Sequence, residues 1–79
     1  MEKIYVKLMN EGSVAYRPVP SSKVSDNIYK LMGSDIYDIE DETWEFLPET
    51  LVLTEKKELG GKLVLVAVEE IFDMAKSRR

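Results

Sequence analysis

Residues 35–49 concentrate the side chains with which this sequence could do chemistry. The segment holds seven of the fifteen acidic residues and no lysine or arginine. Its acids are Asp35, Asp38, Glu40, Asp41, Glu42, Glu45 and Glu49. The rest of the chain carries eight acids and eleven bases, so the net charge of −4 combines a mildly basic body with one strongly acidic segment. Such a segment attracts cations or basic surfaces and repels phosphate groups.

Metal binding and catalysis are the first uses to consider for these carboxylates. Ca²⁺ takes about six to eight oxygen ligands, but the acids lack the EF-hand spacing and its central glycine. Paired carboxylates can hydrolyse glycosides, but they need a cleft around the sugar, for which a chain of 79 residues has little room. The absence of histidine and cysteine removes imidazole acid–base catalysis, thiolate nucleophiles and Cys/His zinc sites. We therefore expect no enzyme activity, no metal and no cofactor.

A third use is recognition of another protein with a basic surface. Ile36, Tyr37 and Ile39 lie among the acids, although a loop that only needed to be soluble would not require three large apolar side chains. We expect Ile36 and Ile39 to anchor the loop to the core, and Tyr37 with an exposed edge of Trp44 to supply apolar contact area. The predicted binding residues are Tyr37, Asp38, Glu40, Asp41, Glu42 and Trp44. A solvated acidic loop with no partner is the alternative.

Single-stranded nucleic acid is the other candidate ligand, because aromatic side chains beside basic ones can form a stacking surface on a small barrel. The pairs that could build it are Tyr5 with Lys7, Tyr16 with Arg17, and Tyr29 with Lys30. The acidic segment would repel phosphate, so we expect a protein partner rather than nucleic acid. Exposed tyrosines in these pairs would favour nucleic acid, whereas buried aromatics beside an ordered acidic rim would favour a protein.

Short segments of alternating apolar and polar residues, separated by turn residues, predict the strands that position these side chains. The expected strands span residues 2–9, 13–19, 27–32, 43–47, 51–58 and 62–68. Gly12 is placed for the left-handed position of the first turn, and residues 21–26 are expected to form a loop. Pro18 and Pro20 cannot donate ladder hydrogen bonds, so their strand should end at an edge or a bulge.

The last two strands predict a hairpin around Gly60 and Gly61. We favour a three-residue loop, because it sets Glu58 opposite Lys62, whereas a two-residue loop would shift the register by one. Residues 63–68 are apolar at every position, so both faces of this strand need cover. A helix over about residues 69–77 is predicted to cover the outer face, either in its own chain or in a neighbour, which would make a homodimer.

Together these elements predict one mostly-β domain, α+β at the margin, that spans residues 1–79. The expected fold is a small SH3-like barrel or a bent antiparallel sheet of five to six strands with a C-terminal helix. The predicted core residues are Ile4, Val6, Leu8, Val14, Ile28, Leu31, Trp44, Phe46, Leu53, Val64, Val66 and Val68. No segment resembles a signal peptide or a membrane span, which suggests the cytoplasm and no membrane contact.

Four segments carry a resemblance to a group of short bacterial proteins of uncharacterised function. They are Tyr16-Arg17-Pro18-Val19-Pro20, Ile28-Tyr29-Lys30-Leu31, Trp44-Glu45-Phe46-Leu47-Pro48 and the closing strand of residues 63–69. The group shares an (aromatic)-R-P-V segment, a G-x-Y-x-(I/L) segment and W-E-F-x-P, and the similarity covers roughly residues 1–69. Asn27 stands where the group's glycine is expected, and residues 71–79 extend beyond the similarity. The resemblance implies a compact β fold and brings no known activity.

Overall fold

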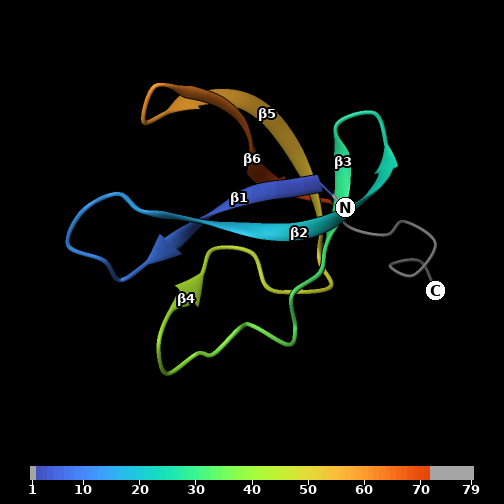
Figure 1. Cartoon of the computed structure of the whole chain (residues 1–79). Coiled ribbons are helices and arrows are strands. Elements are labelled where there is room, and N and C mark those ends of the chain that lie inside the picture. The colour runs from blue at the N-terminus through green and yellow to red at the C-terminus, as the bar shows by residue number, and fades with distance from the viewer. Residues whose placement is uncertain (1, 72–79) are drawn as a thin grey trace.

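The chain folds into six short strands arranged in one sheet (Figure 1). The computed structural model describes residues 2–71, and every regular element among them is a strand. The strands are β1 (Glu2–Met9), β2 (Tyr16–Ser25), β3 (Ile28–Leu31), β4 (Thr43–Trp44), β5 (Leu51–Leu59) and β6 (Lys62–Glu70). The prediction of a mostly-β chain with five to six strands is therefore confirmed.

Hydrogen bonding closes the sheet on itself. The ring runs β1, β2, β3, β5 and β6, and β6 returns to β1 where Val66 lies opposite Tyr5. The four pairs between successive strands are antiparallel, and the closing pair is parallel. Five strands that alternate in direction must close with one parallel pair, so the expected all-antiparallel sheet is wrong at this seam. β4 extends the edge of β1, with Leu8 opposite Trp44.

The core fills the inside of this ring, and it follows the period-two alternation of the strands. Its buried apolar residues are Ile4, Val6, Val19, Tyr29, Leu31, Trp44, Val52 and Ala67, with Leu8, Tyr37, Phe46 and Leu65 packed against them. Val66 is also buried. The predicted core is thus confirmed for Ile4, Val6, Leu31, Trp44 and Val66 and, as partly buried neighbours, for Leu8 and Phe46.

Five predicted core residues are neither buried nor packed against the core cluster. Val14 is exposed because the return strand begins only at Tyr16. The other four, Ile28, Leu53, Val64 and Val68, are half-buried. Ile28 and Leu53 stand one residue out of phase with the inward-facing Tyr29 and Val52, and Val64 and Val68 lie on the face of β6 opposite Ala67, which they share with the buried Val66. Hydropathy ranked isoleucine above tyrosine and valine above alanine, but strand parity decided which side chain points inward.

The turns differ from the predicted ones in three places. Asn10, with φ of 61°, takes the left-handed position that we assigned to Gly12. The predicted loop at residues 21–26 is wrong, because β2 continues to Ser25 and turns at Asn27, where φ is 65°. The last hairpin turns on two residues, Gly60 and Gly61, so the favoured three-residue loop is wrong and the two-residue alternative holds. Both glycines have positive φ, which that short turn requires.

The chain leaves the sheet at Ile71, whose N–H donates to Leu51 O at 2.8 Å. The predicted helix over about residues 69–77 is wrong at its start, because Glu69 and Glu70 still belong to β6, opposite Leu53 and Val52. The remainder of that prediction, and any homodimer contact through it, lies outside the described residues. Among residues 2–71 there is no helix with the length and hydropathy to span a membrane.

Candidate functional site

The acidic segment follows β3 as an ordered loop of two successive turns. Gly33 O accepts hydrogen bonds from the N–H groups of Ile36 and Tyr37, both at 3.0 Å. Asp38 O then accepts from the N–H groups of Asp41 and Glu42, both at 2.9 Å, and Asp38 Oδ1 accepts from Glu40 N at 3.0 Å. Five N–H groups of the loop are therefore bonded within it, which restricts the backbone of both turns.

Gly33 sets the direction in which this loop leaves the barrel. Its φ of 95° lies in a region that other residues rarely adopt. A Cβ at this position would stand 3.3 Å from Val19 Cγ1 and 3.4 Å from both Ile36 Cγ1 and Trp44 Cη2. The loop thus starts pressed against the end of the core, and only glycine fits there without displacing a neighbour.

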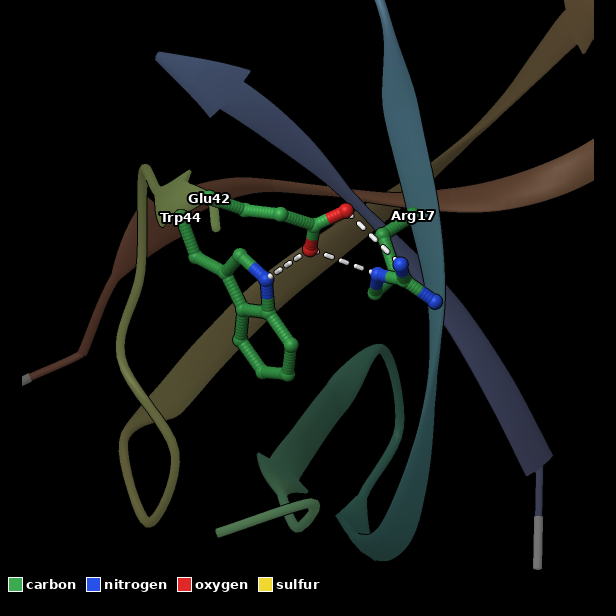
Figure 2. Close-up of polar contacts among 3 residues, drawn as sticks. All are labelled: Arg17, Glu42 and Trp44. Carbon is green, nitrogen blue, oxygen red and sulfur yellow. Dashed lines mark hydrogen bonds and ion pairs between the residues drawn. The ribbon is translucent and has the colours of Figure 1, made fainter. Parts of the chain in front are cut away.

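Glu42 closes the loop onto the barrel through three hydrogen bonds (Figure 2). Its Oε1 accepts from Arg17 Nε at 2.6 Å and from Trp44 Nε1 at 2.9 Å, and its Oε2 accepts from an Arg17 terminal nitrogen at 2.7 Å. Arg17 lies on the same face of β2 as Val19 and Ser21, both fully buried, so it points inward at the end of the ring. The ion pair therefore covers the end of the core.

The electrostatics of this cluster keep Glu42 ionised. The hydrogen bond from Arg17, followed by that from Trp44, holds the pKa of the Glu42 carboxyl below its ordinary value. The same hydrogen bond raises the pKa of the Arg17 guanidinium. A bidentate Arg–carboxylate pair fixes orientation as well as charge. Glu42, predicted as a contact residue, is thus a structural residue whose two oxygens are already engaged.

Of the two aromatic side chains that we expected to contact a partner, Trp44 is buried and Tyr37 is half-buried. Trp44 is only 2% exposed, because its indole N–H finds an acceptor in Glu42 and its ring can be buried without a polar cost. Tyr37 packs against the core edge-on to Trp44, with ring centroids 4.8 Å apart, and its buried hydroxyl has no hydrogen-bond partner. The expectation of an exposed edge of Trp44 is therefore wrong, and Tyr37 is half-buried rather than fully exposed.

The isoleucines of the loop, rather than its aromatic residues, are the exposed apolar side chains. Ile36 is 48% exposed and Ile39 68% exposed, so neither anchors the loop as a buried side chain would. Their neighbours Asp35, Asp38, Glu40 and Asp41 are exposed as well. We call these six side chains the acidic–apolar surface. Among residues 2–71 the two ion pairs join Arg17 to Glu42 and Lys30 to Glu49, and neither uses a carboxylate of this surface.

The aromatic–basic pairs do not share one face. Tyr29 is buried in the core, Arg17 is bound to Glu42, and Lys30 Nζ lies 3.2 Å from Glu49 Oε1. Tyr5 and Tyr16 are half-buried on the outer side of β1 and β2. Of the aromatic side chains, Tyr29 and Trp44 are buried, whereas Tyr5, Tyr16 and Tyr37 are half-buried. In the described part of the chain no three acidic side chains are grouped closely enough to hold a metal ion.

Comparison with known proteins gave no match: no family model, no curated protein and no solved structure is significantly similar to this chain. The resemblance to short bacterial proteins therefore stays a prediction. The structure does join two of the segments that carry it, since Arg17 of the first and Trp44 of the third both donate to Glu42. No sequence spacing signalled this contact, because Arg17 and Glu42 are 25 residues apart and Glu42 is one of seven similar acids.

Proposed function

We propose that the protein is a small non-catalytic interaction module that binds a basic protein through the acidic–apolar surface. The observation that carries the proposal is the exposure of Ile36 and Ile39 by a loop whose backbone is hydrogen-bonded in place. An ordered loop could have turned these side chains inward, as it does for Tyr37. Ile36 and Ile39 are held in water between carboxylates that form no ion pair among residues 2–71, and a partner that covers them explains this arrangement.

The two kinds of side chain contribute to different steps of binding. The four carboxylates Asp35, Asp38, Glu40 and Asp41 attract a basic partner and raise its association rate, an effect that salt screens over about 8 Å at physiological ionic strength. Ile36 and Ile39 lose their contact with water in the complex and so slow dissociation. The partner should therefore present lysine or arginine around an apolar depression, and phosphate-rich ligands should be repelled.

We further propose that the ring of strands is a small SH3-like barrel. The support is its size, its closure through five strands that pair in chain order with β4 outside the ring, and a core cluster inside the ring. In such a barrel the loops between strands carry recognition, because they can vary without disturbing the hydrogen-bond ladder. The acidic–apolar surface lies on such a loop, between β3 and β4.

Site-specific photo-crosslinking in an extract of the protein's own cells tests the proposal. A photoreactive phenylalanine analogue replaces Ile39 in one variant and Val24 in a control. Val24 is also an exposed apolar residue, but it belongs to the β2–β3 hairpin, which lies far from β4 in Figure 1. The proposal predicts a discrete protein adduct from position 39 that position 24 does not give.

A charge-neutralised variant completes the design. It carries Asp35→Asn, Asp38→Asn, Glu40→Gln and Asp41→Asn, and it leaves Glu42 intact because that residue holds the loop. Asparagine at position 38 keeps the oxygen that accepts from Glu40 N. The adduct at position 39 should weaken strongly in this background. No adduct, an equal adduct from both positions, or capture of a labelled single-stranded oligonucleotide instead of a protein would contradict the proposal.

A further inference from the structure

The ring leaves three longer stretches of strand edge without a partner strand among residues 2–71, and proteins commonly block such edges with proline or charge. The first is the part of β2 that β3 does not reach, since β3 pairs only with residues 21–25. Pro20 O accepts from Met32 N at 2.8 Å, so the backbone groups of Pro18 and Pro20 face away from β1. Neither proline offers an N–H there, and this edge is blocked.

The second stretch is the outer half of β5, which runs past the end of β3. The pairing with β3 covers only Leu51 to Leu53. Beyond it stand the exposed residues Glu55, Lys56, Lys57 and Glu58. Four consecutive charged side chains oppose the close approach of another strand, so this edge is protected by charge.

The third stretch, the first half of β6, carries no such protection. The two-residue turn makes Leu59 and Lys62 the hydrogen-bonded closing pair of the hairpin. Because backbone groups alternate along a strand, the N–H groups of Leu63 and Leu65 face away from β5. β1 pairs with β6 only at Val66. The parallel bridge of Tyr5 with Val66 uses the C=O of Leu65 and the N–H of Ala67. Among residues 2–71, the N–H and C=O of Leu63 and the N–H of Leu65 therefore have no partner strand, on an edge that reads Leu-Val-Leu, with neither charge nor proline.

Leu63 is also exposed as a side chain at this edge. It lies on the same face of β6 as Leu65 and Ala67. Ala67 is buried and Leu65 packs against the core, whereas Leu63 is 68% exposed, because the hairpin arcs beyond the ring, away from β1 and β2 (Figure 1). The row of core-facing side chains thus continues past the end of the core into water.

We propose that the protein forms a homodimer in which the free edge of β6 pairs antiparallel with the same edge of a second copy, centred on Leu63. A twofold axis at Leu63 lets its N–H and C=O bond reciprocally to those of Leu63 in the second copy. Reciprocal pairing sets the two Cα atoms about 5.5 Å apart, with both exposed leucine side chains on one face. The edge is therefore complementary to itself, and among residues 2–71 the two other longer stretches of free edge are blocked by proline and by charge.

The oligomeric state of the full chain tests this proposal independently of any other protein. Sedimentation velocity over increasing concentration should show the mass rising from 9.1 kDa to twice that value. Leu63→Pro removes an N–H that the hairpin does not use, and it should leave a monomer at every concentration. Glu58→Pro is the matched control, because Glu58 lies opposite Leu63 and its N–H also faces outward, on the charged edge. It should dimerise like the unchanged protein.

Two further measurements keep the test decisive if proline disturbs the hairpin. Leu63→Lys retains the backbone and places a charge at the axis, so it too should be monomeric, with an unchanged circular dichroism spectrum. In the unchanged protein, exchange of the Leu63 amide hydrogen should slow as concentration rises, while that of Glu58 should not. A mass of 9.1 kDa at all concentrations, or dimers that survive Leu63→Lys, would overturn the proposal.

Discussion

Replacing Glu42 should cost far more stability than replacing any other carboxylate of the acidic segment. The Arg17–Glu42 pair is partly exposed, at 42% and 20% of the two side chains, so solvent screening limits it to about 0.5–1 kcal/mol. Trp44 is buried, and leaving its indole N–H without an acceptor costs about 1–3 kcal/mol more. Glu42→Ala should therefore lower the free energy of unfolding by about 1.5–4 kcal/mol.

Two variants separate the ion pair from the indole hydrogen bond. Glu42→Gln keeps an oxygen that can accept from Trp44, so it should lose only about 0.5–1 kcal/mol. Glu49→Gln makes the same substitution in the exposed Lys30–Glu49 pair, and it should change stability by less than about 0.5 kcal/mol.

Urea unfolding, followed by the fluorescence of the single tryptophan and by circular dichroism, gives the free energies. In a domain of this size, 1 kcal/mol shifts the thermal midpoint by about 4–8 °C, so thermal unfolding should rank the variants identically. If Glu42→Ala were no more harmful than Glu49→Gln, the cluster in Figure 2 would not hold the loop on the barrel.

Three other perturbations have definite expected results. The pKa of Glu42 is lower in the folded than in the unfolded chain. Its ionised carboxylate therefore stabilises the fold at pH values above the ordinary pKa of 4.5, and this stabilisation is lost as the pH falls through the folded pKa. Urea unfolding at a series of pH values should show the difference in free energy of unfolding between the unchanged protein and Glu42→Gln disappearing at that low pH. Gly33→Ala should cost about 1–3 kcal/mol, because its Cβ would press on Val19 at positive φ, whereas Gly12→Ala, with nothing within 4 Å, should be neutral in the same urea assay. Trp44→Ala should cost about 3–5 kcal/mol through the cavity it leaves, and a smaller loss in calorimetry would contradict a core position.

The strands were largely predictable from the sequence because alternation is a local signal. Residues 2–9 show it clearly, and β1 spans the same residues with Ile4 and Val6 inward. Which of the two strand faces points inward was harder to predict where both faces are apolar. In β6 every residue from Leu63 to Val68 is apolar, so hydropathy did not distinguish the core-facing Ala67 from its neighbours. The predicted register of the last hairpin was wrong because we gave a favourable Glu58–Lys62 charge pair more weight than the two-residue turn that Gly60 and Gly61 permit.

The acidic segment is a loop, as the sequence indicated, but its aromatic and aliphatic side chains were assigned to the wrong sides. We expected tyrosine outside and isoleucine inside, since tyrosine is common in interfaces. The orientation depends on Gly33 and on the Arg17–Glu42 contact, and a contact between residues 25 apart has no local signature. Arg17 also occupies an inward position of β2, where sequence alternation predicts an apolar residue. An arginine at such a position needs a carboxylate partner, and that requirement is the one clue the sequence contained.

The association rate of the partner captured through Ile39 tests the central claim most directly. It should be measured at low ionic strength with the unchanged protein and with the variant that neutralises Asp35, Asp38, Glu40 and Asp41 but keeps Glu42. Because electrostatic steering raises association rates by about 10- to 1000-fold, the neutralised variant should associate at least about tenfold more slowly, and added salt should remove the difference. Equal association rates at low salt, with both proteins folded, would contradict a binding role for the acidic–apolar surface.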